Sequence, residues 1–276
     1  MCKNKLLCST GALITRRNGR NYKLLEDVAP HIDCDGFEFM MYNSWYDIWD
    51  SLADYLQNTG IAFPVLHVEK GIGEAISRNE EGDCEQAQRL FEINCKMARI
   101  IGAHKLVLHL WNGVPSDRDI ENNIEQYGIL TETAKSMGLL LTVENVVCNR
   151  LDPLTHFEAL KKRYQDVVFT FDVKFAKFHD QLDAAFGNDY RWLWEAVRHV
   201  HISDYAGGYC DWDKLHSLHP GEGNIDFKNV FLNLERMNYA NTVTVESTSV
   251  LPDGSIDLDK LNASLRYIRG LMGVRR

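Results

Sequence analysis

Leu139-Leu-Leu-Thr-Val-Glu144, the helical stretch 153–164 and Val167-Val-Phe-Thr-Phe-Asp172 form one repeat of a pattern that runs through the whole sequence. These two apolar runs each end in an acidic residue, and a stretch with helical periodicity separates them. Near-continuous apolar runs are typical of strands buried on both faces, as in parallel sheets with helical crossovers. The repeat therefore predicts a βαβ unit with a carboxylate at the carboxyl end of each strand.

The same alternation extends in both directions and predicts eight strands. We expect them over residues 5–10, 36–40, 63–68, 105–109, 139–144, 167–172, 200–203 and 242–246. The clearest helices are expected over 84–101, with Asp83 as N-cap, and over 119–137. Shorter helices are expected over 22–30, 47–57, 153–164, 227–237 and 258–271. Because no linker or compositional shift interrupts the pattern, it predicts an α/β fold, a single-domain (β/α)8 TIM barrel over residues 1–276, rather than an open doubly wound sheet.

Composition excludes several classes of protein. A content of 45% hydrophobic and 25% charged residues is that of a globular chain with a sizeable core. The net charge of -9 repels phosphate backbones, so no nucleic acid partner is expected. The seven cysteines contain no Cys-x-x-Cys and predict neither a disulfide framework nor a zinc knuckle. No signal peptide or membrane-spanning run is evident, so we expect a cytoplasmic protein without a membrane partner.

Four consecutive strands end in side chains that could bind a cation. Glu144, Asp172 and Glu246 each follow an apolar strand core, and His201 ends the strand between the last two. Taken singly, each acid could cap the next helix or form a salt bridge, and the histidine could be a hydrogen-bonded core residue. Their coincidence favours a site for one divalent metal ion, for which Mn²⁺, Mg²⁺, Co²⁺ and Zn²⁺ are all acceptable.

The motifs at these strand ends resemble those of the xylose isomerase-like TIM barrel superfamily, which contains sugar and sugar-phosphate isomerases and epimerases, inositol-pathway enzymes and endonuclease IV. The matching motifs are Thr-Val-Glu144-Asn, Phe-Asp172, His-Val-His201-Ile-Ser-Asp204, His219-Pro-Gly-Glu-Gly-Asn-Ile-Asp-Phe227 and Val-Glu246-Ser. The resemblance implies that Glu144, Asp172, His201 and Glu246 are the metal ligands. It also implies that Glu144 and Glu246 are catalytic, moving a proton beside the carbonyl of a small sugar or sugar phosphate through a metal-stabilised enediolate.

Four further residues are expected to bind substrate. His67 and His109 match the first zinc pair of endonuclease IV, but isomerases of the superfamily also keep histidines there to bind substrate hydroxyls. Trp111 could stack on a sugar ring or pack in the core. Lys174 could contact a substrate phosphate, carboxylate or enediolate oxygen, or pair with Asp172.

Two departures from the superfamily pattern leave the reaction open. Phe175 stands where many members have a histidine after the strand-six aspartate, which argues against a trinuclear DNA-repair site; His179 is a candidate replacement. Asn149-Arg150 stands where ketose epimerases have a further glutamate. The alternatives are an inosose-type dehydratase, an endonuclease IV-like metal phosphodiesterase and a non-catalytic ligand-binding barrel. The resemblance is compatible with a homo-oligomer.

Overall fold

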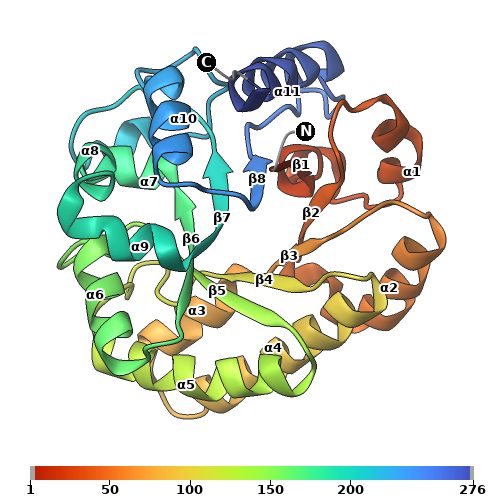
Figure 1. Cartoon of the computed structure of the whole chain (residues 1–276). Helices are drawn as coiled ribbons and strands as arrows, with labels where there is room; N and C mark the ends of the chain where they lie inside the picture. The colour runs from red at the N-terminus through yellow and green to blue at the C-terminus, as the bar shows by residue number, and fades with distance from the viewer. Residues whose placement is uncertain (1–3, 274–276) are drawn as a thin grey trace. The chain divides into compact units, whose positions relative to one another are not determined.

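The computed structural model describes residues 4–273, whose eight strands form a closed parallel sheet in the order β1 to β8 (Figure 1). The predicted (β/α)8 TIM barrel is thus confirmed. The strands are β1 Lys5–Ser9, β2 Phe37–Met40, β3 Val65–His67, β4 Lys105–Leu108, β5 Leu140–Glu144, β6 Val168–Asp172, β7 Val197–Ile202 and β8 Thr242–Val245. Strand β7 begins three residues before the expected position, because Arg198 and His199 interrupt the apolar pattern of the sequence without interrupting the strand.

Helices follow the strands as expected, with additions. They are α1 Leu24–Val28, α2 Trp49–Asn58, α3 Lys70–Arg78, α4 Asp83–Ile100, α5 Ile120–Ser136, α6 Pro153–Arg163, α7 Val173–Phe178, α8 Leu182–Ala185, α9 Arg191–Ala196, α10 Phe227–Arg236 and α11 Leu258–Gly273. Helices α3 and α7 to α9 were not predicted, because α3 contains two glycines and the other three are only four to six residues long. No helix within residues 4–273 is both long and apolar enough to cross a membrane.

The predicted N-cap of α4 is wrong. Gly82, with φ 82°, occupies the cap position, and Asp83 is the first residue of the helix. The Asp83 carboxylate instead accepts hydrogen bonds from the Arg78 guanidinium at 2.6 and 2.8 Å. An ion pair between the end of α3 and the start of α4 has therefore replaced the expected side-chain cap.

The chain divides into two compact units. The first, which we call the terminal unit, comprises the described parts of Met1–Glu38, Asp172–Glu195 and His199–Arg276; the second, the central unit, comprises Phe39–Phe171 and Ala196–Arg198. That residues 1–276 form a single domain stays a prediction.

In the terminal unit, β1 pairs in parallel with both β2 and β8, and β7 pairs with β8. The register aligns Ser9 with Glu38 and His201 with Thr244. Helix α11 contacts both α10 and β1, and Figure 1 shows this helix, in dark blue, beside the amino-terminal strand. The carboxyl ends of β7 and β8 therefore lie next to each other in this unit.

In the central unit, β3, β4, β5 and β6 pair in order, and α3, α4 and α5 pack against one another. The register aligns Glu144 with Thr170. The hydroxyls of Thr142 and Thr170 lie 2.7 Å apart and are fully buried, so these residues point from neighbouring strands toward each other. The alternation of side chains along a strand then gives Glu144 the same direction as Thr142.

Gly73 allows α3 to approach the end of β4 closely. A Cβ atom at residue 73 would lie 1.8 Å from the backbone carbonyl oxygen of His109. Glycine inside a helix is usually unfavourable, by about 0.5–1 kcal/mol relative to alanine. At residue 73 only glycine fits, because any Cβ atom would collide with the backbone of His109, a predicted site residue.

We expect Gly73→Ala to lower the free energy of unfolding by roughly 1–3 kcal/mol, the range typical of an overpacked core. Gly270→Ala in α11 is the matched control, because a Cβ there meets nothing within 4 Å. This control should raise the free energy of unfolding by about 0.5–1 kcal/mol. Urea denaturation measures both, and equal stability of the two variants would contradict the close approach of α3.

Candidate metal centre

Three of the predicted ligands come together in the terminal unit: Asp172 at the end of β6, His201 in β7 and Glu246 directly after β8. Each offers one ligand atom, and these atoms lie within 4.8 Å of one another. His201 Nδ1 is 3.5 Å from Glu246 Oε2. Asp172 and His201 are completely buried, and the Glu246 side chain is 14% exposed. Two carboxylates and an imidazole at this separation fit a divalent cation such as Mn²⁺, Mg²⁺, Co²⁺ or Zn²⁺.

Asp172 has a second role in the local structure. Its Oδ1 accepts a hydrogen bond from the backbone N–H of Phe175 at 2.8 Å and so caps the N-terminus of α7. Because α7 begins at the very next residue, the carboxylate is held at the junction of strand and helix. The helix-cap alternative raised by the sequence is therefore correct, and it is compatible with a ligand role for the other oxygen.

Glu38 orients His201. His201 Nε2 lies 3.1 Å from both Glu38 oxygens, and His199 Nε2 lies 2.7 Å from Oε2. All three side chains are completely buried. Burial alone would raise the pKa of Glu38, but the charges and hydrogen bonds of His201 and His199 outweigh it and hold this pKa well below its usual range. Since a carboxylate only accepts, His201 donates from Nε2 and turns Nδ1 toward Glu246.

Glu38 was missed by the sequence reasoning, although a signal was present. It is the single charged residue of Gly36-Phe-Glu-Phe-Met40, an otherwise apolar strand. A charge buried on both faces of a parallel sheet requires a partner. The partners, His199 and His201, are more than 160 positions away in the sequence, so only the closed order of the strands brings them to it.

Glu144, His67 and His109 come together in the central unit, at the ends of β5, β3 and β4. Glu144 Oε2 is 2.8 Å from His109 Nε2 and 3.5 Å from His67 Nε2. His67 Nδ1 is 2.9 Å from the carbonyl oxygen of Val68, and His109 Nδ1 is 3.2 Å from Asn112 Oδ1. All three predicted site residues are buried, with exposures of 1 to 4%. They form a compact cluster of one carboxylate and two imidazoles.

Trp111 is completely buried, and its indole N–H donates to the carbonyl oxygen of Val146 at 3.0 Å. Its ring contacts His156 and Phe157, with centroids 5.0 and 6.3 Å apart. These contacts favour the core-packing alternative for Trp111 over stacking on a sugar. His179, the candidate replacement for the missing histidine, has its Nδ1 3.9 Å from Cys210 Sγ.

Asp204 builds the loop that follows β7. Its Oδ1 accepts backbone N–H groups of Tyr205 and Ile225, and its Oδ2 accepts those of Gly221 and Gly223, at 2.8 to 3.1 Å. A Cβ atom on Gly223 would lie 2.4 Å from Asp204 Oδ1. The aspartate and glycines of the sequence motif are therefore structural, since they close this loop around one buried carboxylate.

The same loop is attached to the end of β8. The backbone N–H of Thr248 donates to the carbonyl oxygen of Ser217 at 3.3 Å, and the Ser247 hydroxyl donates to the carbonyl oxygen of Leu218 at 3.0 Å. Ser217 is thus held beside Thr248, which follows Glu246 by two residues in the chain. These two hydrogen bonds attach the β7–α10 loop to the segment that follows Glu246.

Residues 27–270 match the xylose isomerase-like TIM barrel family. The chain belongs to this family. Among solved structures of similar fold are D-allulose 3-epimerase from Methylomonas sp. in complex with D-allulose (16% identity, TM-score 0.71, covering 97% of this chain and 96% of the other) and 3-keto-D-glucoside 4-epimerase from E. coli (18%, 0.68, 97% and 99%). A third is the IOLI protein with a bound zinc atom (16%, 0.68, 97% and 96%). A search of curated proteins found no match. At these identities, the similarity of this xylose isomerase-like barrel to solved structures establishes the fold alone.

The pKa of one cluster residue predicts a pH effect on stability. Burial lowers the pKa of His109 from 6.5 to about 4, although the neighbouring Glu144 charge acts in the opposite direction. The folded protein therefore holds this ring neutral between pH 4 and 6.5, where the unfolded chain would protonate it.

We expect this histidine to contribute stability that is complete above pH 6.5 and is lost as the pH falls to about 4. The loss amounts to roughly 3 kcal/mol in the free energy of unfolding. Urea denaturation of metal-free wild type and His109→Gln across this pH range measures the effect, because the variant lacks the titrating ring. Identical pH dependence in the two proteins would show that the ring does not stay neutral when buried.

Proposed function

We propose that this protein is a metal-dependent isomerase or epimerase of a small sugar or sugar phosphate. The observation that carries the proposal is the convergence of Asp172, His201 and Glu246 on one buried point of the terminal unit. A site with two carboxylates and an oriented imidazole suits a cation that binds substrate oxygens. The epimerases among the structures of similar fold, and the zinc atom of one of them, support this choice.

We assign Glu144 as the fourth ligand. Support comes from the strand register, because Glu144 pairs with Thr170 and Asp172 follows two residues after Thr170 on the same strand. Side chains two residues apart on a strand project from the same face. Glu144 and Asp172 are each the last residue of their own strand.

Under this proposal, two glutamates transfer the proton and two histidines orient the substrate. A divalent cation, when bound, would supply positive charge to stabilise the negative charge that develops on the substrate oxygens. Glu144 and Glu246 act as the two acid–base groups: one removes the carbon-bound proton and the other returns a proton from the opposite face, which inverts that carbon. His67 and His109 orient substrate hydroxyls, and the lowered pKa of His109 keeps its ring neutral near pH 7.

We expect Glu246→Gln to keep the fold and to lose turnover by roughly 10²–10⁴-fold, the range for removal of an acid–base group. The assay is NMR detection of deuterium incorporation and product formation in D2O, with Mn²⁺ and a panel of ketoses, ketose phosphates and keto acids. Glu235→Gln on the exposed side of α10 is the control and should retain full activity. Wild-type exchange rates in Glu246→Gln would refute the proposal, and the same spectra would reveal a dehydration product.

A second variant tests the orientation of His201. We expect Glu38→Gln to weaken Mn²⁺ binding by roughly 10–100-fold, because the amide removes the charge that fixes the Nε2–H and turns Nδ1 toward the ligand set. Isothermal titration calorimetry of Mn²⁺ measures this in the absence of substrate. Glu235→Gln again serves as the control, and unchanged affinity in Glu38→Gln would remove Glu38 from the site.

A further inference from the structure

The side chain of Lys174 is unusually buried for a lysine. It lies in the first turn of α7 and is 6% exposed. Its Nζ donates to the Ser217 hydroxyl at 3.0 Å and lies 4.3 Å from the centroid of the Phe175 ring. Within residues 4–273, no acidic side chain lies at ion-pair distance from this ammonium group. The alternative in which Lys174 pairs with Asp172 is therefore not supported.

Among the residues that the structure describes, one hydroxyl accepts a hydrogen bond from this ammonium group. An ammonium has three N–H donors, of which the serine hydroxyl accepts one. The face of an aromatic ring attracts a cation, but this contact replaces only part of the hydration lost on burial. Burying an unpaired charge lowers stability, and such a cost is commonly kept where a ligand provides the missing partner.

The position of Nζ connects it to the candidate metal centre. Helix α7 starts directly after Asp172, whose carboxylate caps it. Ser217, the partner of Nζ, is held beside the end of β8 by the hydrogen bond to Thr248, two residues after Glu246. The ammonium group therefore lies in the terminal unit, between the segments that carry two of the proposed ligands.

We propose that Lys174 binds an anionic group of the substrate, either a carboxylate or a phosphate. This inference rests on the proposed function and narrows it to acidic sugars or sugar phosphates, with neutral ketoses excluded as the preferred substrates. A lysine ammonium is a compact point charge that suits either anion. The hydroxyl of Ser217 then becomes a neighbouring donor for the same anion by rotation of its O–H.

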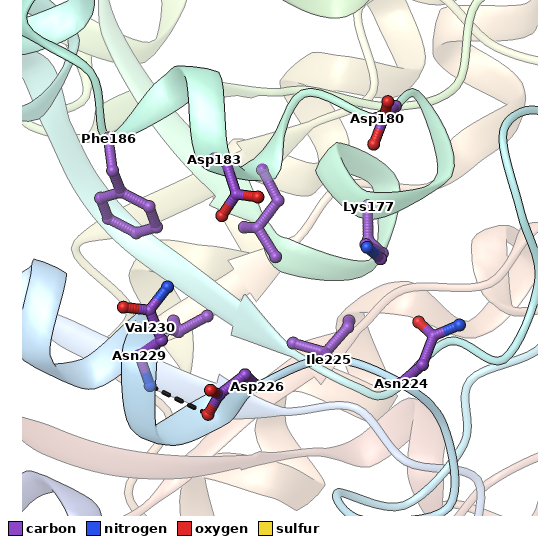
Figure 2. A pocket seen from close by; sticks show the side chains of 10 residues that line it. Lys177, Asp180, Asp183, Phe186, Asn224, Ile225, Asp226, Asn229 and Val230 are labelled. Atoms are coloured by element: carbon purple, nitrogen blue, oxygen red, sulfur yellow. Dashed lines mark hydrogen bonds between the residues drawn. The ribbon is translucent and has the colours of Figure 1, made fainter.

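Lys177 provides a matched control on the same helix. It lines a cavity of about 200 Å³ together with Asp180, Asp183 and Asp226, between α7–α8 and the start of α10. Figure 2 shows Lys177 in this pocket with Asp180 and Asp183 on neighbouring parts of the same wall. Its surroundings are acidic, so Lys177 is not expected to bind an anion.

The test is calorimetric titration of the metal-free protein, at low ionic strength and with EDTA, using inorganic phosphate, D-gluconate and neutral D-fructose as probes. We expect wild type to bind phosphate or gluconate but not fructose, and the tighter of the two anions identifies the substrate class. Lys174→Met should weaken anion binding by roughly 10- to 100-fold, as for loss of a charge-assisted hydrogen bond. Lys177→Met should bind like wild type.

Thermal unfolding distinguishes ligand binding from a structural role. We expect Lys174→Met and Lys174→Gln to unfold at or above the wild-type temperature, and the anion to stabilise wild type but not these variants. Absence of anion binding in wild type, or equal binding in Lys174→Met, would overturn the inference, as would lower unfolding temperatures in both variants with unchanged binding.

Measurements on the proposed reaction separate the two ideas. Anion binding that depends on Lys174, in a protein without Mn²⁺ binding or deuterium exchange, would leave the anion subsite standing and remove the isomerase. Turnover of a neutral ketose with the same KM in wild type and Lys174→Met would remove the subsite and leave the isomerase.

Discussion

The carboxylate of Glu38 is the constraint around which the terminal unit is arranged. It has no access to water, and two imidazoles from one strand supply the hydrogen bonds that replace its hydration. Such a group is tolerated only with its full set of partners, because loss of either one leaves a buried charge uncompensated. The hydrogen bonds of Glu38 to His199 and His201 therefore connect β2 to β7. They also leave Nδ1 of His201 directed toward Glu246.

The same requirement governs the remaining acids. Glu144 is matched by His67 and His109 in the central unit, and Asp204 by four backbone N–H groups. Asp172 is held partly by the first turn of α7. Each of these carboxylates therefore has its own set of local hydrogen-bond partners. Lys174 differs from them, since among the described residues its ammonium group contacts a hydroxyl and an aromatic ring and no acidic side chain lies at ion-pair distance.

The barrel could be predicted from the sequence because its signal is local. Apolar runs such as Leu139 to Glu144 identify buried strands without knowledge of any distant contact. The strand-end acids and His201 could be found for the same reason. Glu38 could not be assigned, because its role depends on partners more than 160 positions away. Helix α3 could not be predicted because glycines are unfavourable in helices. The reason for Gly73 is its close approach to the carbonyl oxygen of His109, which the sequence does not reveal. Asp204 was recognised as part of a motif, but its structural role required the loop geometry.

One carboxylate joins two neighbouring parts of the molecule. Asp172 ends a strand of the barrel and, through Oδ1, also holds the first turn of a helix only six residues long. Any displacement of that side chain toward a cation would pull on the backbone of Phe175 and thus on the turn that carries Lys174. Under the proposed function, the place of Asp172 in the ligand set and the position of Lys174 would therefore depend on one shared hydrogen bond.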